Sequence, residues 1–310
     1  KKYYYSEEKI AIVGMGGLFP DAPNINTFWE NILNRKVSIK NVPEHIFNSK
    51  VFYRPEMYGQ INKQDKSYTR VGALVDKASF DILSRKYRIP PTVAEYMDPN
   101  QHTAIYCVDQ ALQSIKSPIP REQTAVIFGT GAPGTHYDNV TRRTYYYRVR
   151  EQIMNNPKIK STFTSEELEE LINDITEKSL EGTLPITEDS APSMLQSITA
   201  GRICNVFDFR GPAYTVDSAC ASALTATICG ITGLLRKDYD VAFVGGVEVT
   251  MSEIPMVVFS GINALSPDGS FPFDKRANGF VIGLGGGVLV LKRLEDALRD
   301  KDEIYGIISG

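Results

Sequence analysis

The chain has 310 residues, of which 42% are hydrophobic, so it is long enough to bury a large core. Its 34 lysines and arginines nearly balance its 37 aspartates and glutamates, and a net charge of -3 creates no field that would attract nucleic acid or an anionic membrane. No apolar run reaches the roughly 18 residues of a membrane span, and the first residues lack the apolar core of a secretion signal, so we expect a cytoplasmic protein.

Cysteine and histidine usage argues against disulfides and metal. The chain has four cysteines: Cys107, Cys204, Cys220 and Cys229. They form no CxxC pair and no histidine lies near them in sequence, so we expect free thiols and no zinc site. The chain begins without a methionine and stops in a strand-like segment, which indicates an excerpt of a longer polypeptide.

Short apolar segments alternate with amphipathic helices, a pattern typical of an α/β protein with helices on both faces of a mixed, largely parallel sheet. The expected strands are residues 9–16, 124–131, 213–218, 240–249, 286–294 and 304–309. The expected helices are residues 24–34, 99–115, 193–202, 220–236 and 295–300. Asp98 and Pro99 suit a cap and a first helical residue, and Thr27 and Glu30 have capping-box spacing.

Residues at about 135–192 interrupt this pattern and are interpreted as an insertion or lid. They contain a basic, aromatic patch, RRTYYYRVR (142–150), then an acidic helix over 165–178, then a turn-rich stretch over 182–192. Arginines interleaved with tyrosines are typical of single-strand nucleic-acid binding, but nine residues carry that interpretation poorly. A solvated face, or a docking site for an acidic protein that uses Arg148 and Arg150, are the alternatives.

Glycine-rich turns invite a nucleotide-binding interpretation, which the sequence disfavours. Residues 129–134 follow a strand and formally fit GxGxxG, but they contain Pro133, and no second strand ends in an acidic residue about 20 positions later. The GLGGG stretch at 283–287 precedes a strand instead of opening a helix, and no P-loop occurs. We therefore expect no directly bound cofactor.

Residues 214–235, YTVDSACASALTATICGITGLL, contain the candidate catalytic group. Sixteen consecutive residues from Cys220 carry no charge, which predicts a central helix buried on all sides. Cys220 falls in its first turn, where free amides favour a thiolate and could also stabilise an oxyanion on a thioester carbonyl. A nearby Asp217 carboxylate would oppose the thiolate, although Asp217 or Ser218 could instead cap the helix. By residue type alone, Cys220 could equally be a small core hydrophobe, as we expect for Cys229.

The stretch GPAYTVDSACASAL (211–224) resembles the active-site block of β-ketoacyl synthases. Similar blocks run along almost the whole chain, at residues 10–32, 88–91, 97–101, 262–297 and 304–310. Within that family, the long segment before AGRICNVFDFRGPAYTVDSACASAL is most similar to the ketosynthase domains of iterative polyunsaturated-fatty-acid and polyketide synthases.

This resemblance implies a thiolase-like fold of two α/β halves, of which residues 1–310 are the N-terminal region and the C-terminal half lies outside the chain. It implies that Cys220 is the nucleophile and that its backbone N–H is an oxyanion donor. The implied partners are an acyl carrier protein, whose phosphopantetheine arm presents the acyl and malonyl thioesters, the other domains of a multidomain synthase, and a second copy in a homodimer.

The resemblance also leaves parts of the chemistry outside this chain. The family's two catalytic histidines and lysine lie in HGTGT-like and KxxxGH-like motifs, and neither motif occurs here. The three histidines, His45, His102 and His136, lie in other blocks and take no such role. Leu284 replaces the glutamate of a GEG triplet, and its effect on turnover stays open.

Three functional hypotheses therefore remain open. The first is the acylating part of an active β-ketoacyl synthase. The second is a condensing domain that accepts an acyl chain without extending it, as a gate or scaffold. The third is a carrier-protein docking module without catalysis. We also expect the isolated chain to aggregate, because it supplies cover for only one side of helix 220–235.

Overall fold

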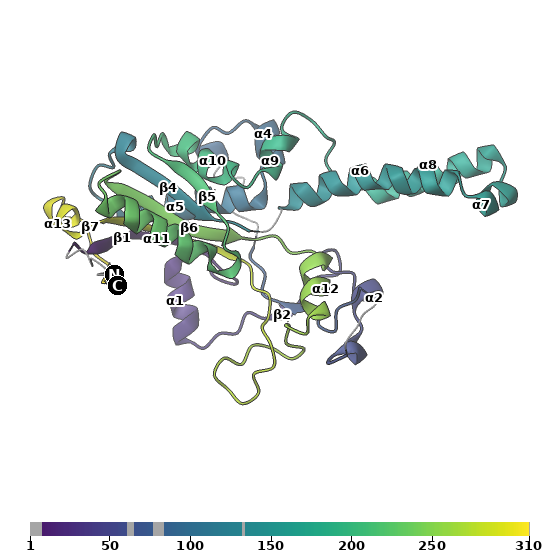
Figure 1. Ribbon diagram of the computed structural model, residues 1–310, viewed down its shortest axis with the longest axis horizontal. Coiled ribbons are helices and arrows are strands. Elements are labelled where there is room, and N and C mark those ends of the chain that lie inside the picture. The colour runs from purple at the N-terminus through teal and green to yellow at the C-terminus, as the bar shows by residue number, and fades with distance from the viewer. Residues whose placement is uncertain (1–7, 61–64, 77–83, 132–133, 310) are drawn as a thin grey trace, which may run out of the picture.

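The computed structural model describes residues 8–60, 65–76, 84–131 and 134–309 (Figure 1). Its strands are β1 (Ile10–Leu18), β2 (Lys40–Asn41), β3 (Val71–Gly72), β4 (Thr124–Gly129), β5 (Ala213–Val216), β6 (Val241–Glu248), β7 (Gly285–Arg293) and β8 (Gly306–Ile308). Its α-helices are α1 (Ile25–Leu33), α2 (Ser49–Phe52), α4 (Pro91–Tyr96), α5 (Pro99–Ser114), α6 (Thr135–Met154), α7 (Pro157–Thr162), α8 (Ser165–Leu180), α9 (Ser190–Met194), α10 (Ile198–Phe207), α11 (Ser222–Leu235), α12 (Glu253–Gly261) and α13 (Leu294–Arg299). Short 3-10 turns are η1 (Pro55–Met57), η2 (Arg121–Gln123) and η3 (Ala219–Ala221).

The main sheet has the strand order β5-β4-β6-β7-β1-β8. Strand β4 pairs in parallel with β5 and β6, whereas the β6–β7, β7–β1 and β1–β8 pairs are antiparallel. The sheet is therefore mixed, as expected, but the prediction that it is largely parallel is wrong. For β7 to run parallel to β6, the connection between them would need a helix packed on the sheet. The connecting helix is α12, and its Met256 packs in a separate hydrophobic cluster instead.

Helices cover both faces of this sheet, as the sequence predicted (Figure 1). On one face, α5 and α10 pack Ile105, Val108 and Ile203 against Phe128 and Phe243 of the central strands. On the other face, α11 packs against a second cluster that includes Ala226, Leu234, Ile127, Val244 and Leu291. The sheet interior is thus closed by apolar contacts on both sides, which holds the strand ends in fixed positions.

A smaller lobe lies beside the sheet and contains α2, α12 and the β2–β3 pair (Figure 1). Its core consists of Val42, Phe47, Tyr68, Met256 and Leu265. These residues come from two distant stretches, 42–68 and 256–265, so the region that sequence reasoning left as loops has a hydrophobic centre that it shares with α12.

Helix boundaries differ from the predictions in two places. The cap of α1 is Asn24, whose side chain accepts the Thr27 amide at 2.8 Å, and not the predicted pair of Thr27 and Glu30. The single helix expected over 193–202 is divided into α9 and α10. The cap of α5 is as predicted: Asp98 accepts the Asn100 amide at 2.9 Å, and Pro99 is the first helical residue.

Residues 135–192 are mostly helical, and α6, α7 and α8 form an arm that extends away from the sheet (Figure 1). At 1.5 Å per residue, the 20 residues of α6 span about 30 Å. Tyr146, Leu168 and Ile172 are buried between α6 and α8, and the Tyr146 and Thr176 hydroxyls share a hydrogen bond of 2.7 Å. The RRTYYYRVR patch thus belongs to a helix, and the interpretation of the whole segment as an insertion stays a prediction.

No helix in the part of the chain that the structure describes combines the length and apolarity needed to cross a membrane.

Candidate active site

The site lies at the edge of the sheet where the three parallel strands end. Because β5, β4 and β6 run in the same direction, their carboxyl ends meet at one edge, where ligands of open α/β sheets bind. Cys220 follows β5, the turn at 129–134 follows β4, and Glu248 is the last residue of β6. Residues 132–133 of the predicted GxGxxG turn lie outside the described residues.

Cys220 lies in the turn η3, directly before α11, and its side chain is exposed. The prediction that it occupies the first turn of the α-helix is therefore wrong by one turn. Helix α11 begins at Ser222 because the chain reverses at Ala219, which has the left-handed φ of 52°. A left-handed alanine costs of order 1–3 kcal/mol, so the surrounding contacts must hold this conformation.

Three hydrogen bonds hold the turn that carries Cys220. The Asp217 carboxylate accepts the Ala219 amide at 2.9 Å, the Ser222 hydroxyl donates to the Ala219 carbonyl at 2.7 Å, and the Ser218 amide donates to Ser222 Oγ at 2.9 Å. The predicted alternative that Asp217 or Ser218 caps the helix is not found, because the cap position is Ala221. Both residues instead brace the turn.

Two glycines set how closely α11 approaches the sheet. A Cβ on Gly129 of β4 would lie 2.5 Å from the Ser222 carbonyl carbon, and one on Gly246 of β6 would lie 2.8 Å from the Ala223 Cβ. No side chain fits at either position without displacing its neighbours in α11. The absence of these two side chains therefore allows the start of α11 to rest directly on the strand ends.

The environment of Cys220 differs from that of the other cysteines. Burial raises the pKa of Cys107 to about 12 and that of Cys204 to about 11, so both thiols stay protonated near neutral pH. Cys229, which we expected in the core, is only half-buried in the middle of α11, where it packs against the second cluster. Cys220 is the exposed thiol of the four. Its backbone N–H donates to no group among the described residues, so this amide is available to an oxyanion.

Helix α11 is covered on one side only. Ala226, Gly230 and Leu234 face the sheet and are buried, whereas Leu224 and Ile228 are 69% and 62% exposed. The prediction of burial on all sides is therefore wrong for these residues. Burial of a leucine or isoleucine side chain contributes about 1.5–3 kcal/mol. It would therefore be favourable for another part of the protein, or another chain, to pack on this face.

Two carboxyl groups lie at the same edge of the sheet; sequence reasoning gave Asp98 only as a helix cap and missed Glu248. Asp98 is 1% exposed, and its carboxylate accepts the Asn100 amide of α5 at 2.9 Å and the His136 amide of α6 at 3.3 Å. Burial raises the pKa of Asp98, and a Cβ on Gly134 would lie 2.0 Å from its Oδ2. One carboxylate therefore caps two helices and fixes the base of the arm.

Glu248 provides the second of these carboxyl groups. Burial raises the pKa of its carboxyl to about 7. The neighbouring Asp98 carboxylate also raises this pKa, whereas the hydrogen bond that Glu248 accepts from the Thr250 amide lowers it. A single acidic residue at the carboxyl end of the apolar segment 240–249 was the available sequence signal. Glu248 of β6 pairs with Gly285 of β7. The residue before Gly285 is the buried Leu284, which stands where the family has a glutamate. This edge of the sheet therefore carries a carboxyl on the adjacent strand.

The three histidines take the ordinary positions that the sequence suggested. His45 is exposed, while His102 and His136 are buried in α5 and α6. Burial lowers the pKa of His136, whose ring stacks on Tyr96 at 6.1 Å. Nowhere in the described ranges do three histidine, cysteine or acidic side chains come together in a way that could hold a metal ion.

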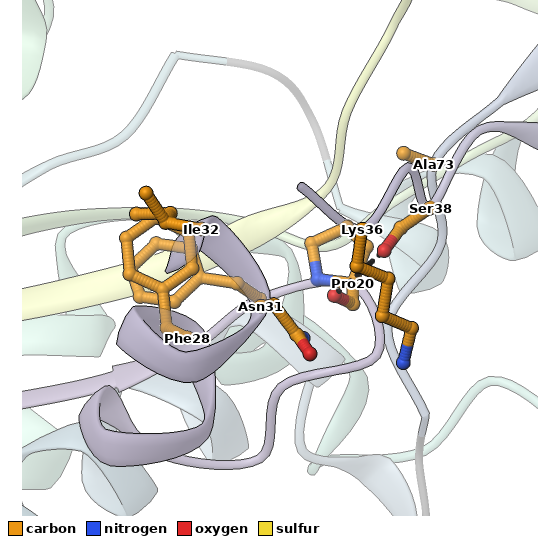
Figure 2. A pocket seen from close by; sticks show the side chains of 8 residues that line it. Pro20, Phe28, Asn31, Ile32, Lys36, Ser38 and Ala73 are labelled. Carbon is orange, nitrogen blue, oxygen red and sulfur yellow. Dashed lines mark hydrogen bonds between the residues drawn. The ribbon is translucent and has the colours of Figure 1, made fainter. Parts of the chain in front are cut away.

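One pocket lies beside α1 and does not include Cys220. Figure 2 shows Phe28, Asn31 and Ile32 of α1 on one side and Pro20 and Ala73 on the other. Its volume is about 190 Å³, and none of its lining residues comes from β5, η3 or α11. The Cys220 side chain itself is exposed.

Comparison with known proteins gives the family. Residues 7–297 match the family model described as "Beta-ketoacyl synthase, N-terminal domain". The chain is 32% identical to polyketide synthase PksL of Bacillus subtilis, over 98% of this chain and 6% of that protein. It is 29% identical to a phenolphthiocerol/phthiocerol polyketide synthase of Mycobacterium tuberculosis, over 98% of this chain and 17% of that protein.

Solved structures agree with the sequence relatives. The ketosynthase from module 6 of the bacillaene synthase of Bacillus subtilis matches with a TM-score of 0.68 and 27% identity, over 97% of this chain and 42% of that one. An oxazolomycin ketosynthase domain of Streptomyces albus matches in fold with a TM-score of 0.72 at 24% identity, over 97% of this chain and 45% of that one. The predicted thiolase-like fold is therefore confirmed, and the chain spans less than half of each matched structure. This chain belongs to the β-ketoacyl synthase family.

Proposed function

We propose that this chain is the acyl-accepting part of a β-ketoacyl synthase domain in a multidomain fatty-acid or polyketide synthase, and that Cys220 is its nucleophile. The single observation that carries the proposal is the placement of the exposed Cys220 thiol on a braced turn, at the amino end of α11, with its own amide unpaired among the described residues.

The proposed first step is transfer of an acyl group to Cys220. Its sulfur, as thiolate, attacks the thioester carbonyl that the phosphopantetheine arm of an acyl carrier protein presents, and the Cys220 N–H donates to the resulting oxyanion. Collapse of this intermediate releases the pantetheine thiolate, which takes up a proton. Covalent capture divides the condensation into two easier steps.

The proposed second step uses a malonyl thioester on a carrier protein. Loss of CO₂ leaves an enolate, whose carbon attacks the Cys220 thioester and expels the cysteine thiolate, giving a β-ketoacyl carrier. We assign the acid–base groups of this step to a C-terminal half beyond Gly310, which would also cover Leu224 and Ile228 of α11. The exposure of those two side chains and the partial coverage of the matched structures support this assignment.

The proposed cellular setting is a cytoplasmic synthase that works as a homodimer. Its cofactor is the phosphopantetheine of the carrier protein, and we expect no cofactor bound directly to this chain. The relatives are named as polyketide synthases, which supports a carrier-bound substrate here.

The test is acylation of the full-length polypeptide that carries these residues. An acyl-pantetheine thioester should add one acyl group to Cys220, detected by mass spectrometry of the peptide. Cys220→Ala should remove the adduct, while Cys229→Ala, in the same helix, should retain it. If no adduct forms with the unaltered protein, the catalytic proposal is wrong and a docking module remains.

A second measurement separates an active synthase from a gate. Malonyl-carrier is added to the acylated protein, and the carrier is examined for the extended β-ketoacyl product. Acylation that is followed by product supports the synthase. Acylation without product supports the domain that accepts a chain and does not extend it.

A further inference from the structure

The arm formed by α6, α7 and α8 separates opposite charges onto different helices. Helices α6 and α7 contain two carboxylates and six cationic side chains: Arg142, Arg143, Arg148, Arg150, Lys158 and Lys160. Helix α8 contains one lysine and six carboxylates: Glu166, Glu167, Glu169, Glu170, Asp174 and Glu177. A basic helix therefore lies beside an acidic one along the whole arm.

These charges do not neutralise each other within the arm. Among the described residues no ion pair joins α6 to α8; Lys178 pairs with Asp174 of its own helix at 2.7 Å, and Arg143 donates to the Thr183 hydroxyl at 2.8 Å. The helices meet instead through Tyr146, Leu168 and Ile172. Most of the charged side chains of both helices are exposed, so another molecule can contact them.

One face of the arm also exposes large apolar side chains. Tyr146 and Ile172 point between the helices, and the residue before each, Tyr145 and Leu171, lies about 100° further round its helix. Because the helices are antiparallel, this equal offset places Tyr145 and Leu171 on the same face. They are 62% and 39% exposed.

An open hollow of about 380 Å³ extends this face towards the tip of the arm. It is lined by Phe163, Glu167, Glu170, Leu171 and Asp174, so an apolar floor has a rim of carboxylates. The apolar floor and acidic rim of this hollow suit a helix that exposes aromatic and cationic side chains, such as Tyr145 and Arg148. In this chain that description fits α6 itself.

We propose that the Tyr145–Leu171 face of the arm binds the same face of a second copy of this chain, with α6 of each copy against α8 of the other. A two-fold contact brings basic against acidic surface twice, because each partner supplies both helices. The exposed apolar side chains lie at the centre of this contact. Salt bridges between the copies, such as Arg148 with Asp174, lie along its two edges, as flanking charges do in helical bundles.

An acidic carrier domain explains the arm less well than a second copy does. Such a partner would be attracted by α6 but repelled by α8, whose axis lies about 8–10 Å away, within the distance over which charges act at physiological salt. Arg150, which the docking alternative would use together with Arg148, is half-buried, while Arg148 is exposed. A second copy satisfies both helices at once.

The test is a disulfide between arms in the full-length polypeptide, with Cys220→Ser as background. Thr141 lies one turn before Tyr145, and Lys178 two turns after Leu171, so both exposed residues belong to the proposed contact face. Within one arm they lie on the outer edges of different helices, beyond the roughly 7 Å that a disulfide tolerates. The variant Thr141→Cys with Lys178→Cys should therefore cross-link two chains on mild oxidation. Tyr147→Cys with Asn173→Cys is the matched control, because each of these exposed residues follows Tyr146 or Ile172 and therefore lies on the opposite face.

Charge reversal gives a second readout that does not depend on one cysteine geometry. Arg148→Glu or Asp174→Arg alone should slow the cross-link about 5-fold, and the two together should restore it, because exposed pairs contribute up to about 1 kcal/mol each. Equal cross-linking by both cysteine pairs, or none by either, would overturn the proposal. So would loss of binding to an isolated acidic carrier domain in Arg148→Glu without any cross-link between arms, which would make the arm a carrier-docking surface.

Discussion

Replacing Gly129 with alanine tests whether the close contact between α11 and the sheet positions Cys220. The added Cβ would lie 2.5 Å from the Ser222 carbonyl carbon and 2.6 Å from the Ala223 nitrogen. Non-bonded atoms attract at about 3.5–4.0 Å, so the overlap is about 1 Å, and both atoms are backbone. Relief therefore requires the first turn of α11 to move.

The expected loss of stability is about 1–3 kcal/mol, the usual cost of overpacking a closed core. A displacement of about 1 Å at the reacting sulfur can lower a rate about 100-fold, so acylation of Cys220 should fall more than stability does. The measurements are the thermal unfolding of the full-length polypeptide and the initial rate of acyl-adduct formation at Cys220.

The matched control is Gly201→Ala in α10, where no atom lies within 4 Å of the added Cβ. This change should leave acylation unchanged and stabilise the helix by up to about 1 kcal/mol. If Gly129→Ala melts and acylates like Gly201→Ala, the sheet contact does not position the nucleophile and the reasoning fails.

Three further predictions concern the carboxyl groups at the sheet edge and the exposed face of α11. Between about pH 4.5 and 7 the folded chain retains a proton on Glu248 that the unfolded chain has released, since burial raises the pKa of this carboxyl from 4.5 to about 7. Stability should therefore fall as pH rises through this window and level off above it; Glu248→Gln should flatten that slope in thermal melts, and an unchanged slope would refute the assignment. Asp98→Ala should destabilise the protein by about 2 kcal/mol because two helices lose their cap, whereas Asp189→Ala, at a cap position without a side-chain bond, should have little effect in the same denaturation assay. The isolated 310-residue chain should scatter light as it aggregates, and Leu224→Ser with Ile228→Ser should reduce that scattering; a well-behaved monomer of the unaltered chain would contradict the idea that this face needs a cover.

The strands were predictable because their apolar runs are short and bounded by turns. Each of β1, β4, β5, β6, β7 and β8 falls on an expected segment, with ends that differ by a few residues. Their directions were not predictable from local pattern. The alternation of strand and helix suggested parallel pairs, and only the packing of α12 away from the sheet makes β7 antiparallel to β6.

The arm shows the same limit at a helix surface. The acidic run over 165–178 indicated α8 from residue types alone, and the structure adds the capping box of Thr164 and Glu167 at its start. The RRTYYYRVR patch gave no sign that Tyr146 would be buried while Tyr145 is exposed. That difference depends on which side of α6 meets α8, and therefore on contacts between residues about 30 positions apart.

For the candidate site, the sequence by itself determined the residue types: an uncharged helix, a cysteine at its amino end and a polar turn before it. Resemblance to a family then supplied a role for Cys220. The tertiary structure alone decided that the thiol is exposed, that Gly129 and Gly246 allow α11 to rest on the strand ends, and that Asp98 and Glu248 lie at the same edge. The physical reason is that burial, close approach and carboxyl pKa depend on neighbours from distant parts of the chain, whereas helix and strand formation depend largely on adjacent residues.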